Sequence, residues 1–328
     1  MQYRNLSGTD LRASIIGFGC ASVLGAVGAG KSRRAMEIAF DEGINYFDIA
    51  RSYGFGAAES FLGKFLRGKR DKICLASKFG ILPPKRNALI DRLRPIIRPA
   101  VKAIRRLAPA VHQNLRQQVG NLVSHHQFSL QIARQSLEQS LRDLQTDHLD
   151  IWFLHECAAD LANSDELFDF INQCVASGKV RYYGVASGIN QVTAILRARP
   201  AVRIAQFASN LADDSIHRFE NPRGVAVNTH SPFGRGSLRK SLSTFFAADP
   251  QSARRWSAML DLDLLSFPGV NEFFLRYSII SNRLGTVICG MYSPEHIRAN
   301  AAAADRAVHS RNVEEVAAEL RQKNAFAV

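Results

Sequence analysis

The sequence predicts an α/β fold of the (β/α)8 (TIM) barrel class, formed by one domain that spans residues 1–328. Eight short apolar segments occur along the chain, and each is followed by a helical pattern or by a loop long enough for a helix. These segments are continuous apolar runs, which are typical of parallel strands covered on both faces. Alternation on this scale gives an open doubly wound sheet or a closed barrel, and eight units favour the barrel.

Turn residues and apolar periodicity place the individual elements. The predicted strands comprise residues 15–19, 45–48, 72–78, 149–154, 180–186, 204–207, 225–228 and 286–289. The predicted helices comprise residues 32–42, 57–66, 130–144, 165–175, 191–197 and 271–281, followed by two closing helices. Leucines spaced three and four residues apart make 130–144 a strong amphipathic helix. A short hairpin is expected in residues 1–14, and a long loop region is expected before residue 271.

Composition indicates a cytoplasmic protein. The five cysteines are scattered and have no CxxC spacing, which is typical of free thiols in a reducing compartment. No apolar run reaches the roughly 18 residues that a membrane helix needs, so no membrane span is expected. The first residues contain no apolar core of the kind found in a signal peptide.

One region carries most of the net charge of +13. Residues 83–128 contain nine lysines and arginines and one acidic residue, Asp91, so this basic insert supplies +8. Its apolar residues have a helical spacing that Pro95 and Pro99 interrupt, and it is long for a loop between a strand and a helix. The insert is interpreted as a helical cover over the barrel mouth with a solvated basic face.

The alternative for the basic insert is a docking site for an anionic partner. A phosphorylated substrate, an acidic carrier protein, a membrane surface and nucleic acid all have the required charge. Aromatic residues are not interleaved with the basic ones, so the stacking surface of a nucleic-acid platform is missing. Nucleic acid is therefore not expected as a partner.

Four polar residues lie at or behind the ends of three consecutive predicted strands. Asp48 ends the second strand, and Tyr53 lies in the loop behind it. Lys78 ends the third strand and His155 follows the fourth. Because active groups of α/β barrels lie at the carboxyl ends of the strands, these side chains are expected to converge. Taken singly, each also fits a structural role, as a turn cap, a half-buried aromatic, a solvent-facing cation or a core histidine.

Together the four residue types suit proton delivery to a carbonyl oxygen. A phenol is a poor acid at neutral pH, because its unperturbed pKa is about 10. Lys78 would lower the pKa of the Tyr53 phenol, and Asp48 would keep the ammonium in place and charged. A neutral His155 would donate a hydrogen bond and orient the substrate oxygen. Arg51 is interpreted as a surface-facing arginine, with the alternative that it biases the pKa of Tyr53 or meets an anionic substrate.

The same residues carry a resemblance to a known family. The segments NYFDIARSYG, LASKFG, LQTDHLDIWFLHE, THSPFGRGSL and ICGMYSPEHIRAN resemble the aldo-keto reductase superfamily, and the resemblance covers most of the chain. The catalytic tetrad of that family falls on Asp48, Tyr53, Lys78 and His155. The resemblance implies a barrel that binds NADP(H) at its mouth, with NAD possible, and that interconverts an alcohol and a carbonyl of an aldehyde, ketone or sugar.

The resemblance also implies cofactor-binding residues after the later strands. Ser187 and Gln206 would contact the carboxamide, although Ala186-Ser187 stands where the family has Ser-Asn. Asn300 would contact the adenine, and Gly290 and His296 replace the usual Lys and Arg at the 2′-phosphate. The remaining candidates lie in the two phosphate-binding loops: Ser231, Phe233, Gly234, Arg235 and Ser293.

Three other features of the sequence suggest different functions. Residues 25–32, GAVGAGKS, match the P-loop pattern of nucleotide triphosphatases, but five residues separate them from the preceding strand. They are interpreted as a flexible loop in which Ser32 caps the next helix. A cofactor-binding regulatory or interaction subunit on the same barrel remains a second class, which turnover assays would distinguish. Neither His125-His126 nor His155-Glu156-Cys157 has the spacing of a metal site, so no metal is expected.

Overall fold

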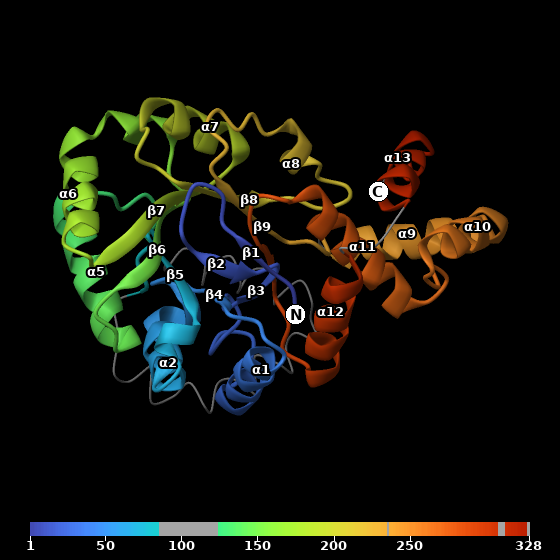
Figure 1. The fold of residues 1–328 in the computed structure, drawn as a ribbon, viewed down its shortest axis with the longest axis horizontal. Coiled ribbons are helices and arrows are strands. Elements are labelled where there is room, and N and C mark those ends of the chain that lie inside the picture. The colour runs from blue at the N-terminus through green and yellow to red at the C-terminus, as the bar shows by residue number, and fades with distance from the viewer. Residues whose placement is uncertain (85–123, 235, 308–311, 327–328) are drawn as a thin grey trace.

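Eight parallel strands close into a barrel in the computed structural model, which describes residues 1–84, 124–234, 236–307 and 312–326 (Figure 1). The strands follow one another around the ring in chain order, and the last pairs with the first. They are β3 (Ile16–Gly19), β4 (Tyr46–Asp48), β5 (Cys74–Phe79), β6 (Leu149–His155), β7 (Val180–Ala186), β8 (Ile204–Ala208), β9 (Ala226–His230) and β10 (Val287–Cys289). The predicted closed barrel is confirmed, and each strand lies within two residues of its predicted bounds.

Helices surround the barrel on its outside (Figure 1). They are α1 (Ala29–Asp41), α2 (Ala58–Leu66), α5 (Leu130–Leu144), α6 (Asp165–Ala176), α7 (Ile189–Ala198), α11 (Phe267–Ser281) and α12 (Pro294–Ala307), with a short α8 (Ser215–Arg218) and the 3-10 turns η1 (Tyr53–Gly56), η2 (Arg70–Lys72) and η3 (Ala159–Asn163). The helix α5 shows why they form. The Ser129 hydroxyl accepts a hydrogen bond from the Ile132 amide at its start, and its leucine face is buried against the strands.

Successive strand residues point to opposite sides, so each strand has an inner and an outer face. In β5, Cys74 and Ala76 belong to the cluster inside the barrel, whereas Leu75 and Phe79 pack against the helices. The next inner position of β5 is Lys78. The same alternation gives Asp48 in β4 and His155 in β6 an inward direction. Because the strands are parallel, these inner positions lie at one end of the barrel.

The opposite end of the barrel is closed by the predicted hairpin. Its strands β1 (Tyr3–Asn5) and β2 (Arg12–Ser14) pair in antiparallel fashion. Leu6 and Leu11, in the turn between them, pack into the inner cluster next to the residues that begin the barrel strands. The hairpin therefore covers the amino ends of the strands, and the polar residues converge at their carboxyl ends.

The expectation of a long loop region before residue 271 is wrong. The segment forms α9 (Gly236–Ala248) and α10 (Pro250–Leu260), which lie with α13 (Val313–Gln322) beside α11 at one side of the barrel (Figure 1). These helices share a second apolar core around Trp256. The start of α10 has a clear sequence signal, because the Asp249 side chain caps the helix and Pro250 occupies its first turn.

Ser32 does not cap α1, contrary to expectation. The helix begins at Ala29 with Gly28 as its N-cap, so Ser32 lies within the first turn. It is fully buried, and its hydroxyl donates to the Val27 carbonyl. The Ser32 hydroxyl is therefore bound to the backbone that precedes α1 and does not cap the helix.

Two other expectations from the sequence concern the basic insert and membrane-spanning helices. Most of the basic insert, residues 85–123, lies outside the described residues, and the helical cover predicted there stays a prediction. Among the described helices, none has both the length and the apolar character needed to cross a membrane.

Candidate active site

Lys78 contacts two of the other candidate catalytic residues directly. The Lys78 ammonium lies 2.5 Å from Asp48 Oδ2 and donates to the Ile49 carbonyl at 3.2 Å. It also lies 3.4 Å from the Tyr53 hydroxyl. Asp48 and Lys78 are 5% and 3% exposed. An ammonium at this depth needs a carboxylate partner, which Asp48 provides.

His155 completes the set from the neighbouring strand. Its ring meets the Tyr53 ring edge to face, with 6.1 Å between the ring centroids. Its Nδ1 atom is buried and has no hydrogen-bond partner among the described residues. The site therefore places a phenol hydroxyl and an uncommitted imidazole side by side at the mouth.

Tyr53 occupies the first position of an unusual turn. Gly54 and Phe55 both have positive φ angles, near 58°. A side chain at Gly54 would bring its Cβ to 2.7 Å from the Val23 carbonyl oxygen, so only glycine fits there. Phe55 adopts the same conformation at a cost, because L-residues other than glycine rarely do so.

The electrostatic environment keeps the Tyr53 phenol protonated. Burial raises its pKa above the ordinary value of 10.0, Lys78 lowers it, and Asp48 raises it again. The predicted lowering by Lys78 is present, but burial outweighs it. For Lys78, burial lowers the pKa of the ammonium, while Asp48 and Tyr53 raise it by more. The ammonium is therefore charged and the phenol carries its proton at neutral pH.

His155 is neutral over the same range. Burial lowers the pKa of its imidazole well below 6.5, and Lys78, His230 and His125 lower it further. A neutral imidazole has one N–H donor and one acceptor nitrogen. It can therefore donate a hydrogen bond to a substrate oxygen without carrying charge into the mouth.

Two contacts at the mouth are absent from the sequence-based prediction. Gln206 Nε2 donates to Asp48 Oδ1 at 3.2 Å, so Asp48 is bound by Lys78 and by a residue from the opposite side of the ring. His230 occupies the inner position of β9 that follows Ala226 and Asn228. Burial lowers the pKa of its imidazole, Asp48 raises it and Lys78 lowers it. The period of two along β9 is the signal that points to His230.

The residues expected at a nicotinamide carboxamide are next to this set. Gln206 Oε1 is buried and lacks a hydrogen-bond partner among the described residues, so it is available to accept from an amide. The Ser187 hydroxyl donates to the Cys157 carbonyl at 2.8 Å, which leaves it only an acceptor role toward a ligand. The unpartnered Gln206 oxygen and the acceptor lone pairs of the Ser187 hydroxyl fit the NH2 group of a carboxamide.

The expected phosphate-binding loops follow neighbouring strands, because β9 pairs with β10. Ser231 and Gly234 have positive φ angles, and the Gly234 amide donates to the Ser231 carbonyl in a tight turn beside Phe233. Behind β10, a Cβ added at Gly290 would meet no atom within 4 Å. Open space there fits the approach of a ligand. Arg235 lies outside the described residues.

The start of α12 gathers the other expected contacts. Ser293 precedes the helix, and its hydroxyl accepts from the His296 amide at 3.3 Å. Asn300 lies one turn further and donates to Met291 Sδ. The same hydroxyl of Ser293 donates to Glu295, whose carboxylate lies in the first turn of the helix. The helix N-terminus suits an anion, but Glu295 opposes one.

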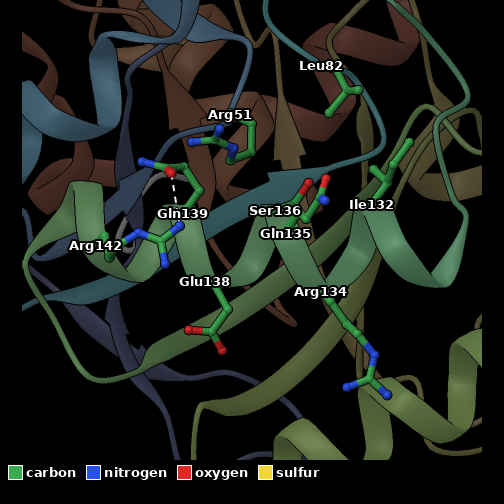
Figure 2. A pocket seen from close by; sticks show the side chains of 9 residues that line it. All are labelled: Arg51, Leu82, Ile132, Arg134, Gln135, Ser136, Glu138, Gln139 and Arg142. Atoms are coloured by element: carbon green, nitrogen blue, oxygen red, sulfur yellow. Dashed lines mark hydrogen bonds between the residues drawn. The ribbon is translucent and has the colours of Figure 1, made fainter.

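Arg51 is neither surface-facing nor directed at Tyr53. Its Nη1 atom lies 2.8 Å from Glu59 Oε2 and 3.1 Å from Asp143 Oδ2. Figure 2 shows its side chain at the edge of a pocket of about 570 Å³ over α5, lined also by Leu82 and Arg142. The pocket contains none of the four candidate catalytic residues. Arg51 is a structural cation between the catalytic loop and the outer helices.

Among the described residues, no group of three or more histidine, cysteine and acidic side chains is placed to bind a metal ion. A closed barrel of eight parallel strands, with titratable side chains gathered at the carboxyl ends of the strands, has the architecture of the TIM-barrel enzymes.

Comparison with known proteins gives the family. A profile of the aldo/keto reductase family matches residues 15–320. The chain is 28% identical over 264 residues to aldo-keto reductase YhdN of Bacillus subtilis, which covers 77% of this chain and 69% of the relative. It is 27% identical over 262 residues to a 6-dehydroglucose reductase of Novosphingobium aromaticivorans, with 75% and 70% covered. The chain therefore belongs to the aldo/keto reductase family, whose members are NAD(P)H-dependent oxidoreductases.

A solved relative has the same fold. The crystal structure of an aldo-keto reductase from Klebsiella pneumoniae in complex with NADPH aligns with a TM-score of 0.66 at 21% sequence identity. The alignment covers 98% of this chain and 95% of the other. The resemblance noted in the sequence is thereby confirmed at the level of family and barrel.

The pKa directions predict how turnover depends on pH. Because the pKa of Tyr53 lies above 10.0, carbonyl reduction is expected to keep its rate as pH rises from about 6 to 9. Alcohol oxidation needs the phenolate, so it is expected to accelerate with pH throughout that range. Because the pKa of His155 lies well below 6.5, no step is expected near that pH. Steady-state rates in both directions measure this, and a fall in reduction before pH 9 would contradict it.

Proposed function

We propose that the protein reduces the carbonyl group of a small aldehyde, ketone or sugar with NADPH and catalyses the reverse oxidation. The observation that carries the proposal is the set of contacts at the mouth: the Tyr53 hydroxyl 3.4 Å from Lys78 Nζ, and Lys78 2.5 Å from Asp48. A phenol, an ammonium and a carboxylate in contact support a site in which Tyr53 donates one proton to a substrate oxygen atom. The relative from Novosphingobium aromaticivorans is a 6-dehydroglucose reductase, which supports including sugars among the candidates.

In the proposed mechanism, Tyr53 is the proton donor. Its hydroxyl transfers a proton to the carbonyl oxygen, which becomes the hydroxyl of the product. A bound nicotinamide cofactor supplies the hydride that the carbonyl carbon receives. The phenolate left on Tyr53 is stabilised by the Lys78 ammonium and regains its proton from solvent. His155 donates a hydrogen bond that orients the carbonyl oxygen toward Tyr53.

The cofactor would lie across the second half of the barrel mouth. Gln206 and Ser187 would accept from the carboxamide. The turn of Ser231, Phe233 and Gly234 would bind the pyrophosphate through backbone amides. Ser293, His296 and Asn300, with Gly290 beside them, would surround the adenosine end. NADP(H) is proposed because relatives bind it, as in the Klebsiella pneumoniae complex.

The anionic partner of the basic insert stays a prediction from composition. Residues 83–128 supply the positive charge on which this prediction rests. Phosphorylated carbonyl compounds in a substrate panel would test the prediction. The cytoplasmic location and the single-domain organisation likewise stay predictions.

Replacing the proposed acid should abolish turnover. Tyr53→Phe is expected to lower the reduction rate by about 10²–10⁴-fold, because a positioned acid is lost. The dissociation constant of NADPH, measured by fluorescence, is expected to stay the same. Turnover is measured over a panel of aldehydes, ketones and sugars.

Tyr183→Phe is the matched control for Tyr53→Phe. Tyr183 lies in the outer core of β7, and its hydroxyl donates to Asn172. Loss of this phenol is expected to leave turnover unchanged. Near-normal activity of Tyr53→Phe would refute the assignment. Wild-type protein that binds NADPH but turns over no compound of the panel would favour the regulatory-subunit alternative.

Glu295 should weaken binding of a 2′-phosphate. Its carboxylate lies in the first turn of α12, beside Ser293 and His296. Glu295→Gln removes a like charge and is expected to tighten NADPH binding by roughly two- to fivefold, with no change for NADH. Glu314→Gln, at an acid in the first turn of α13, is the control and should change neither constant. An equal change for both cofactors would contradict the placement.

A further inference from the structure

A buried carboxylate lies behind the catalytic set, on the outer side of the barrel. Glu59 of α2 is only 2% exposed. Its Oε2 atom accepts from Arg51 Nη1 at 2.8 Å, and its Oε1 atom accepts from Ser77 Oγ at 2.6 Å. Ser77 is completely buried. Both oxygens of this carboxylate are therefore bound, one by a cation and one by a hydroxyl.

The two partners of Glu59 belong to the two segments that carry the catalytic residues. Ser77 is the residue before Lys78, and it points outward where Lys78 points inward. Arg51 lies between Asp48 and Tyr53, and its amide donates to the Lys78 carbonyl at 3.3 Å. Glu59 thus binds both segments from outside, at the level where their inner side chains must meet.

A close approach of two helices supports this arrangement. At Gly63 of α2, an added Cβ would lie 2.4 Å from the Asp143 carbonyl oxygen of α5, so glycine lets the helices come together. Asp143 also binds Arg51, with its Oδ2 atom 3.1 Å from Nη1. Figure 2 shows Arg51 above α5, at the edge of the pocket already described. Arg51 therefore connects the catalytic loop to both helices.

The catalytic contact needs external support. The distance of 3.4 Å between Lys78 Nζ and the Tyr53 hydroxyl is long for a hydrogen bond, so a small displacement would break it. Tyr53 is followed by Gly54 and Phe55, which both have positive φ angles. The conformation of Phe55 is unfavourable in isolation, so contacts with the surrounding structure stabilise this turn together with the hydrogen bond from the Tyr53 amide to the Ala50 carbonyl at 3.1 Å.

We propose that Glu59, with Arg51 and Ser77, is a positioning unit that sets the distance between the Tyr53 hydroxyl and Lys78. The proposal rests on the proposed function, because it assumes that Tyr53 is the acid. None of the three side chains is proposed to touch substrate or cofactor. They act on the rate of proton transfer, and they act on the pKa of Tyr53 through the distance between the Lys78 ammonium and the phenol.

The direction in which the pH midpoint of alcohol oxidation should shift follows from the groups that surround the Tyr53 phenol. Burial raises the pKa of Tyr53, Lys78 lowers it, and Asp48 and Cys20 raise it further. The His155 ring lies edge to face against the Tyr53 ring, and Tyr292, whose own pKa is raised by burial, Cys20 and Tyr53, is a further nearby phenol. If the positioning unit is broken, Lys78 moves away and its lowering effect weakens. The pH midpoint of alcohol oxidation then shifts upward, and kcat decreases in both directions.

Glu59→Gln tests the unit, because it removes the charge and keeps the shape. It is expected to lower kcat by about 10- to 100-fold, since a displacement near 1 Å has effects of this size. The KM of the carbonyl substrate and the dissociation constant of NADPH should change by less than about twofold. Ser77→Ala breaks one hydrogen bond without changing a charge, and a smaller decrease of kcat is expected.

A double variant tests whether the residues act as one unit. Arg51→Met alone is expected to behave as Glu59→Gln does, and the combined variant should lose no more than either single one. Arg51→Lys keeps a cation and should recover part of kcat. Additive losses of kcat would indicate two independent effects and would refute the proposal that the residues act as one unit.

Asp150→Asn is the matched control for Glu59→Gln. Asp150 is a buried carboxylate of β6 that binds Arg70 and Arg181, both at 2.9 Å. It lies five residues before His155, about 16 Å along the strand. Both variants should lower the melting temperature, but Asp150→Asn should leave kcat and the oxidation midpoint unchanged.

The outcomes separate this proposal from the function on which it rests. If Tyr53→Phe is inactive while Glu59→Gln and Ser77→Ala keep the wild-type kcat and midpoint, the positioning role is wrong and the function stands. If Asp150→Asn loses kcat equally, the effect is general destabilisation and the proposal is also wrong. If Tyr53→Phe retains activity, the function itself fails. If Glu59→Gln does not fold, the kcat of Ser77→Ala alone tests the positioning role.

Discussion

The buried ion pair between Lys78 and Asp48 is the interaction on which the site depends. Removing an ammonium from water costs several kcal/mol unless its charge is matched. Here the carboxylate lies 2.5 Å away, and the Ile49 carbonyl and the Tyr53 hydroxyl complete the surroundings of the ammonium. Gln206 binds the other oxygen of Asp48 from across the barrel. The pair connects the neighbouring strands β4 and β5, and the Gln206 contact adds β8 from the opposite side of the closed barrel.

Burial and charge act against each other on the phenol. The interior raises the pKa of Tyr53, which keeps the proton available at neutral pH, and Lys78 limits that increase. The same interior keeps His155 uncharged, so the mouth offers one proton and one neutral hydrogen-bond donor. These properties suit reduction at neutral pH. The distance between Lys78 and Tyr53 controls the balance, which is why the support behind the strands matters for the chemistry.

The sequence predicted the features that depend on local periodicity. Asp48, Lys78 and His155 could be placed together because strand ends and the inward–outward alternation are visible in the chain. The contact of Gln206 with Asp48 could not be predicted, because it depends on which strands face each other across the ring. The pairing of Glu59 with Ser77 depends on how α2 packs on β5, which no local pattern specifies. The helices α9 and α10 were missed although Asp249-Pro250 marks the start of one of them.

The central claim is that a charged Lys78 lowers the pKa of a buried Tyr53. Ultraviolet difference titration measures it directly, with the signal of one tyrosine isolated by subtracting Tyr53→Phe from the wild type. The same subtraction is made in a Lys78→Met background. The account predicts that the pKa of Tyr53 is higher without Lys78 than with it. An unchanged or lower pKa in the Lys78→Met background would contradict it.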